Sequence, residues 1–188
     1  MQRTQSAILS AALIAFAGSA AAQTPRPATT PASTPPPAHS AAKAAMSPDA
    51  EFAQKAAMGG SKEVAEGKLV AGKTKNADVK ALANRLVTDH SAANKELMAL
   101  MKTKHIGAGA PMKEAEPWKT QTGAAFDRAW VDHVIEDHQK DIAEFEKEAN
   151  SGSDPELKAW ASGKLPTLRE HLKMAEDAKA KVGSTTNR

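Results

Sequence analysis

The sequence predicts an all-α protein whose folded part is a four-helix bundle. Four long segments repeat apolar residues at helical spacing, and no segment alternates apolar and polar residues as a half-buried β-strand would. The chain has 188 residues and no cysteine, so a hydrophobic core rather than disulfides must hold it together. Long amphipathic helices supply such a core when they pack as a bundle.

The first 22 residues have the features of a secretory signal peptide. Arg3 supplies a basic start, an apolar run extends from Ala7 to Ala17, and small residues precede Gln23. A membrane helix is the alternative, but this run is well short of the roughly 20 residues that cross a bilayer. We therefore expect residues 1–22 to be cleaved and the protein to be exported, to the periplasm or the cell envelope. No later segment is apolar enough to span a membrane.

Residues 23–46 are rich in Pro, Ala and Thr. This composition buries too little apolar surface to fold, so we expect a disordered tether. The bundle is expected over residues 47–183, followed by a disordered tail at 184–188.

The first helix is expected to begin at Ser47, which can cap it, with Pro48 in its first turn. Its inward stripe extends to Val70. Gly59 and Gly60 lie inside this segment and are expected to kink or loosen the helix.

The other three helices follow the same kind of pattern. The second is expected over about Ala77 to Lys104, with Gly107 able to close it. The third is expected over about Gly123 to Ala149. The fourth opens at Asp154-Pro155 and contains Pro166, which is expected to bend it.

The lengths of the connections indicate how the helices are ordered. The first and last connections are short, so each joins two antiparallel neighbours. The middle connection, of about 16 residues, can reach roughly 50 Å when extended, whereas a helix of about 28 residues is roughly 42 Å long. It can therefore run the length of the bundle, as in the ferritin-like order with one long crossover. A simple up-and-down bundle is the alternative.

A candidate metal site follows from the polar residues on the inward stripes. His90, His138 and His171 interrupt the apolar stripes of the second, third and fourth helices, and Glu63 and Glu66 lean inward on the first. Bundle metal sites are built from such groups on facing helices. Imidazole and carboxylate ligands together suit Fe, Zn or Mn. The alternative is a metal-free core in which these groups hydrogen-bond to one another.

The other polar and charged residues do not indicate a further site or a particular partner. His133 falls off the inward line and is expected to pair with Asp137 at the surface. The formal charge of +3 is spread over interspersed basic and acidic residues, so no nucleic-acid partner is indicated. The sequence indicates no oligomeric state.

These residues resemble a bacterial envelope family, the domain of unknown function DUF4142, whose members are often labelled predicted outer-membrane proteins. The resemblance extends over about Asp49 to Lys181 and implies a ferritin-like bundle and an exported location, but no established activity. The matching pieces are Glu63-Val64, Glu66-Gly67-Lys68-Leu69, Val79-Lys80, Asp89-His90, Phe126-Asp127, His138, Leu165-Pro166-Thr167-Leu168 and His171-Leu172.

Di-iron members of the ferritin-like superfamily place a Glu-x-x-His motif on two helices, and this sequence lacks that motif. The residues three before the inward histidines are Val87, Ile135 and Leu168, so di-iron oxidase chemistry is not expected. The chain is thus expected to be an exported ferritin-like protein with a metal ion in its core. The alternative is a metal-free structural or stress-protective envelope protein. No general base or nucleophile can be singled out, so the question of an enzymatic activity stays open.

The signal-peptide prediction can be checked by expressing the chain in a host that exports it. The soluble protein should begin near Gln23 when its intact mass is measured. A soluble product that keeps the residues before Ala22 would contradict the prediction.

Overall fold

A computed structural model describes residues 46–110 and 116–184, with side chains up to Val182. The predicted signal peptide and all but the last residue of the predicted tether lie outside this part of the chain. The predicted tail lies outside it too, apart from Ser184.

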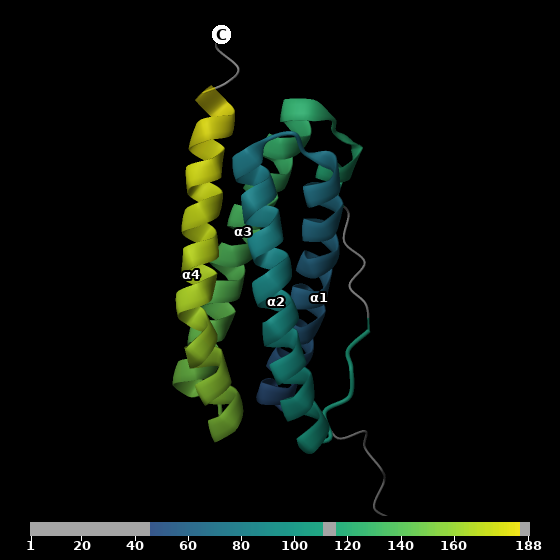
Figure 1. Ribbon diagram of the computed structural model, residues 1–188. Coiled ribbons are helices and arrows are strands. Elements are labelled where there is room, and N and C mark those ends of the chain that lie inside the picture. Colours follow the sequence, from purple (N-terminus) through teal and green to yellow (C-terminus); the bar gives the residue numbers. More distant parts are fainter. Residues whose placement is uncertain (1–45, 111–115, 185–188) are drawn as a thin grey trace, which may run out of the picture. The chain divides into compact units, whose positions relative to one another are not determined.

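Four long helices form the described part (Figure 1). They are α1 (Pro48–Lys73), α2 (Ala77–Thr103), α3 (Gly123–Ser151) and α4 (Pro155–Ser184), with a short 3₁₀ helix η1 (Pro117–Thr120) ahead of α3. No β-strand occurs within the described ranges, and the all-α prediction is confirmed.

The helices are ordered as in ferritin-like bundles. α1 and α2 form one antiparallel hairpin, and α3 and α4 form another (Figure 1). α2 ends at one end of the bundle and α3 begins at the other, so the connection between them runs the length of the bundle. The hairpins pack through α1 against α3 and through α2 against α4. The long crossover is therefore confirmed, and the up-and-down alternative does not apply.

The helix ends are satisfied by local hydrogen bonds. The Ser47 hydroxyl accepts a hydrogen bond from the Ala50 amide at 3.2 Å, and Asn76 Oδ1 accepts from the amides of Asp78 and Val79. α2 is closed by His105, whose φ of 55° lies in the left-handed region. The prediction that Gly107 would close α2 placed that turn two residues too late.

The glycine pair in α1 does not interrupt the helix, which is continuous from Pro48 to Lys73. A Cβ atom on Gly60 would lie 2.5 Å from Asn94 Oδ1 on α2. Gly60 is therefore explained by the close approach of the two helices rather than by a break. Pro166 likewise lies within a single α4.

The hydrophobic core is divided into parts along the bundle. One large cluster fills the end where α1 turns into α2 and η1 packs on α3. Two smaller clusters, around Phe52 and Phe145 and around Leu97 and Leu157, fill the opposite end. Between them each helix buries a polar residue, and these four are Glu63, His90, His138 and His171. Of the described helices, none has an apolar run long enough to cross a membrane.

Asp49 fastens the start of α1 to the turn between α3 and α4. Its two carboxylate oxygens accept hydrogen bonds from the amides of Ser153 and Asp154, at 2.9 and 3.0 Å. Asp49 is 9% exposed, so these charge-assisted bonds are largely shielded from water.

Replacing Asp49 by Ala should lower the free energy of unfolding by about 1–3 kcal/mol, because two amides lose a charged acceptor. Urea unfolding monitored by circular dichroism measures this change. Glu51→Ala is the control, since Glu51 is an exposed acidic residue in the same helical turn. Equal effects of the two substitutions would show that Asp49 does not fasten the helices.

Candidate metal centre

The polar layer at mid-bundle draws one side chain from each helix. Glu63 comes from α1, His90 from α2, His138 from α3 and His171 from α4. All four are at most 7% exposed. Each occupies the position that helical spacing assigns to the core-facing stripe of its helix, which is why the sequence could indicate them.

The three imidazole rings meet at the centre of this layer. Their ring centroids are 5.2 to 5.6 Å apart. One nitrogen from each ring lies within 4.8 Å of the others. The shortest approach joins His138 Nε2 and His171 Nδ1 at 3.3 Å.

The second nitrogen of His138 and of His171 faces an oxygen outside this centre. His138 Nδ1 lies 3.1 Å from the Val134 carbonyl oxygen, which can only accept, so this nitrogen carries the hydrogen. His171 Nε2 lies 2.9 Å from Asp89 Oδ2 and donates to that carboxylate. A neutral imidazole has one N–H, so His138 Nε2 and His171 Nδ1 are left as facing lone pairs.

The Glu63 carboxyl group lies beside the rings of His90 and His138. Its Oε2 atom is 3.2 Å from His90 Nδ1, and its Oε1 atom is 3.4 Å from His138 Nδ1. His90 Nε2 is buried and makes no hydrogen bond. When His90 carries its hydrogen on Nδ1, the nitrogen that faces Glu63, its Nε2 atom is a third lone pair with no protein partner.

The histidines are neutral at physiological pH. Burial, together with the neighbouring His171, lowers the pKa of His90 to about 3. Burial, with His90 and His171 nearby, also lowers the pKa of His138 to about 3. The pKa of His171 is lowered by burial, against the opposing effect of Asp89. Neutral rings keep their lone pairs available, and metal ions require this.

Two carboxyl groups beside the histidines are pushed toward their neutral forms. Burial raises the pKa of Glu63 well above its usual value, and nearby Asp141 and Asp137 add to the effect. Burial and Asp137 raise the pKa of Asp141 to about 7. By contrast, hydrogen bonds from His171 and Arg85 outweigh burial at Asp89 and lower its pKa. The ionised carboxylate of this layer is therefore Asp89.

Glu66 does not reach the three rings. It lies one turn beyond Glu63, where its Oε2 atom is 3.2 Å from His133 Nε2. His133 also contacts Asp137 at 3.2 Å, so the expected pair exists, but its ring is only 18% exposed. Of the five residues that the sequence pointed to, the structure thus brings together Glu63 and the three inward histidines, while Glu66 belongs to a different cluster.

Sequence reasoning missed Asp89, Arg85 and Asp141. Asp89 is the residue before His90 and lies off the inward stripe, yet its carboxylate reaches across to α4 and receives His171. Arg85, one turn earlier on α2, pairs with Asp89 and Glu170. Asp89 lies four residues after Arg85, a spacing typical of an exposed helical ion pair, and the resemblance that included Asp89-His90 gave Asp89 no role.

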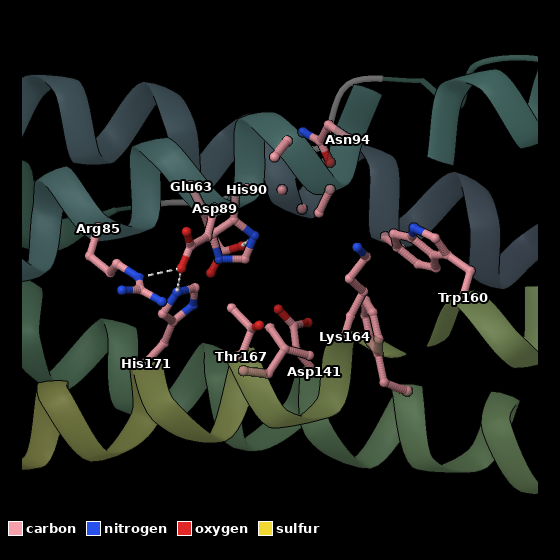
Figure 2. Close-up of a pocket in the computed structure, with 17 residues that line it drawn as sticks. Glu63, Arg85, Asp89, His90, Asn94, Asp141, Trp160, Lys164, Thr167 and His171 are labelled. Carbon is pink, nitrogen blue, oxygen red and sulfur yellow. Dashed lines mark hydrogen bonds and ion pairs between the residues drawn. The ribbon is translucent and has the colours of Figure 1, made fainter. Parts of the chain in front are cut away.

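A cavity of about 190 Å³ adjoins the centre between the helices (Figure 2). His90, His171 and Glu63 line one end, and Trp160 lies at the other. Small residues of α1 and α2 leave this space open, and they are Ala56, Gly59, Gly60, Ala92 and Ala93. The centre is therefore buried but has a path toward its imidazoles.

Fold and site together define a ferritin-like four-helix bundle with three histidines and a glutamate at its centre. The chain matches the family model described as "Domain of unknown function (DUF4142)" over residues 34–178, and it belongs to that family. A comparison with curated protein sequences finds no match.

Two solved structures share the fold. A DUF305 fragment from Deinococcus radiodurans matches with a TM-score of 0.66 at 14% identity, covering 72% of this chain and 97% of that one. A DUF305 protein from Streptomyces coelicolor, described as a predicted secreted protein, matches with a TM-score of 0.65 at 15% identity, covering 73% of this chain and 94% of that one. At these identities the similarity shows the fold alone.

The raised pKa of Asp141 should make the stability of Asp141→Asn depend on pH. The folded state keeps the Asp141 proton up to about pH 7, whereas the unfolded state loses it near pH 4. The parent therefore loses stability as the pH rises between these values. At pH 8 the variant should be more stable than the parent by on the order of 1–4 kcal/mol, since one pKa unit corresponds to about 1.4 kcal/mol. At pH 4 the two should be nearly equal.

Urea unfolding of chelator-treated protein at both pH values measures this difference. Asp132→Asn is the control, because Asp132 lies on the exposed face of the same helix. A gain for Asp141→Asn that is the same at pH 4 and pH 8 would contradict the prediction.

Proposed function

We propose that this chain is an exported protein that binds one transition-metal ion through His90, His138 and His171. The observation that carries the proposal is the facing of His138 Nε2 and His171 Nδ1 at 3.3 Å when the other nitrogen of each ring is already used as a donor. Two lone pairs at this distance repel unless a cation lies between them. Low pKa values argue against a shared proton, because burial disfavours a charged ring.

The distance itself suits two ligands of one ion. Imidazole nitrogens bind Zn²⁺ at about 2.0–2.1 Å, so two of them in a tetrahedral set lie about 3.4 Å apart. Metal-binding histidines usually donate their remaining N–H to a carboxylate or a backbone carbonyl. Asp89 and the Val134 carbonyl occupy such positions at His171 and His138. Glu63 lies 3.2 Å from His90 Nδ1, where it can orient that ring.

The donor set favours some metals over others. Three neutral imidazoles suit Zn²⁺ or Cu²⁺, and Fe²⁺ less strongly, whereas Mn²⁺ prefers oxygen ligands. Glu63 is the nearest carboxyl group, but its oxygens approach the Nδ1 atoms of His90 and His138, on the side of the rings away from the centre. We therefore assign Glu63 and Asp89 to orienting the ligands.

An exported location is consistent with the signal-peptide features of residues 1–22 and with the secreted assignment of the Streptomyces coelicolor relative in fold. The donor geometry supports binding of a metal ion. We therefore propose metal binding in the cell envelope.

The test is metal binding by untagged protein after treatment with a chelator. Added Zn²⁺ at about 100 times its dissociation constant should stabilise the parent by about 2.7 kcal/mol, which raises its melting temperature. His138→Ala and His171→Ala should lose this response, and Asp89→Asn should weaken binding by about 10–100-fold. His105→Asn is the matched control, since it removes an imidazole at the end of α2 and tolerates the left-handed backbone there.

A double-mutant cycle separates this proposal from a metal-free hydrogen-bonded core. His138→Ala and His171→Ala should be coupled by about 0.5–3 kcal/mol if the rings meet, with or without a metal. Coupling without any response to Zn²⁺ or Cu²⁺ would favour the metal-free structural alternative. Additive effects and no metal response would contradict both.

A further inference from the structure

A second cluster of metal-ligating groups lies outside the three-histidine centre, between α1, α3 and the start of η1. Glu66 from α1, His133 from α3 and Glu116 before η1 each place one ligand atom within 4.8 Å of the others. Asp137, one turn after His133, adds a carboxylate 3.2 Å from His133 Nε2. The cluster thus holds one imidazole and three carboxylates drawn from three separate segments.

His133 Nε2 has more acceptors than it can serve. It lies 3.2 Å from both Glu66 Oε2 and Asp137 Oδ2, but one N–H satisfies only one acceptor well. The ring is held in place by stacking on Trp118, with the two centroids 5.9 Å apart. Two carboxylate oxygens and a ring nitrogen at this spacing are positioned to share one cation.

Glu66 also has an oxygen without a hydrogen bond. Its side chain is 4% exposed, and Glu66 Oε1 is buried with no hydrogen-bond partner. The nearest cationic group is Lys62 Nζ, at 3.7 Å. Such a buried carboxylate oxygen is costly unless a positive charge comes close.

Lys62 supplies positive charge to the cluster through one hydrogen bond, to Asp137, and two longer ion pairs. Its ammonium nitrogen is 3.3 Å from Asp137, 3.7 Å from Glu66 and 4.0 Å from Glu116. For comparison, Lys104 approaches each of its two carboxylate partners at 2.6 Å. The ammonium group of Lys62 therefore neutralises three carboxylates only in part, and a divalent cation could take its place.

The cluster can be reached from solvent. His133, Lys62 and Asp137 line an open groove of about 800 Å³, which also bears Asp132 and Glu136. Acidic groups along such a groove raise the local concentration of cations.

We propose that Glu66, His133, Glu116 and Asp137 form a second metal site, selective for a divalent cation that prefers oxygen ligands, such as Mn²⁺. One imidazole with several carboxylates is the donor set that suits such harder ions. The three-histidine centre offers nitrogen ligands, so the two sites should differ in the metal they prefer. This site shares no ligand with that centre and does not depend on it.

The experiment titrates the chelator-treated mature chain with Mn²⁺ alone and follows free Mn²⁺ by electron paramagnetic resonance. The parent should remove about one equivalent of free Mn²⁺ from solution, since the cluster offers one set of donors. Glu66→Gln and His133→Asn should each weaken binding at least about tenfold, because the first removes the negative charge of a ligand and the second removes the ring nitrogen Nε2. Glu116→Gln, at the edge of the bundle, serves if either buried substitution prevents folding, which circular dichroism would show.

Lys62→Gln distinguishes a metal site from a structural ion-pair network. Removing the competing ammonium should tighten Mn²⁺ binding, whereas a merely structural Lys62 would give no such gain. His171→Ala should leave Mn²⁺ binding unchanged, so failure of the three-histidine proposal is distinguishable from failure of this one. Glu136→Gln is the control within the groove, since Glu136 is an exposed partner of Lys140.

The proposal is overturned if the parent removes no Mn²⁺ at millimolar concentration. It is also overturned if Glu66→Gln and His133→Asn bind Mn²⁺ as the parent does. Weaker or unchanged binding by Lys62→Gln would equally contradict it.

Discussion

The structure depends on a layer of buried polar side chains that crosses the bundle at half its length. Three imidazoles and one carboxyl group replace apolar side chains there, and each unsatisfied polar atom in such a place is worth about 1–3 kcal/mol of lost stability. The layer is tolerable because every helix contributes one member and because Asp89 and the Val134 carbonyl receive two of the ring N–H groups. It also separates the apolar cluster at one end from those at the other. The register of the four helices is thereby fixed, since a slip of one turn would bury a histidine among apolar groups.

The three-histidine centre and the Glu66–His133 cluster differ in their surroundings and in their neighbouring charges. Around His90 and His138 the dry surroundings hold the rings neutral. Around Glu66 and His133, three carboxyl groups face Lys62 at the wall of an open groove. A low-dielectric interior penalises net charge far more than a groove does, which explains why the nitrogen-rich cluster is the inner one. Glu63 lies between them, and the acidic residues on the groove side help to keep it protonated.

Much of the fold could be predicted from residue spacing. The apolar stripes, the Ser47 cap and the long second connection specified four helices and their order, because each depends only on residues within one segment or on the length of a connection. The inward positions of His90, His138 and His171 followed for the same reason. The separation of Glu63 from Glu66 could not be predicted, because residues three apart differ by only about 60° around a helix. The rotation of α1 within the bundle decides which of them faces the centre, and that rotation depends on packing such as the contact of Gly60 with Asn94. The role of Asp89 could not be predicted because its partner, His171, lies on another helix.

The long crossover has a consequence for assembly. Glu63 and His90 belong to the α1–α2 hairpin, and His138 and His171 belong to the α3–α4 hairpin. Each hairpin alone therefore carries half of the polar layer, and the layer is completed only when the two halves dock. An ion held by all three histidines would join the halves as a non-covalent cross-link, so its binding energy would contribute directly to hairpin association. The same connectivity makes the molecule suited to fragment complementation, because separate halves contain all the groups needed to rebuild the layer without the covalent link between them.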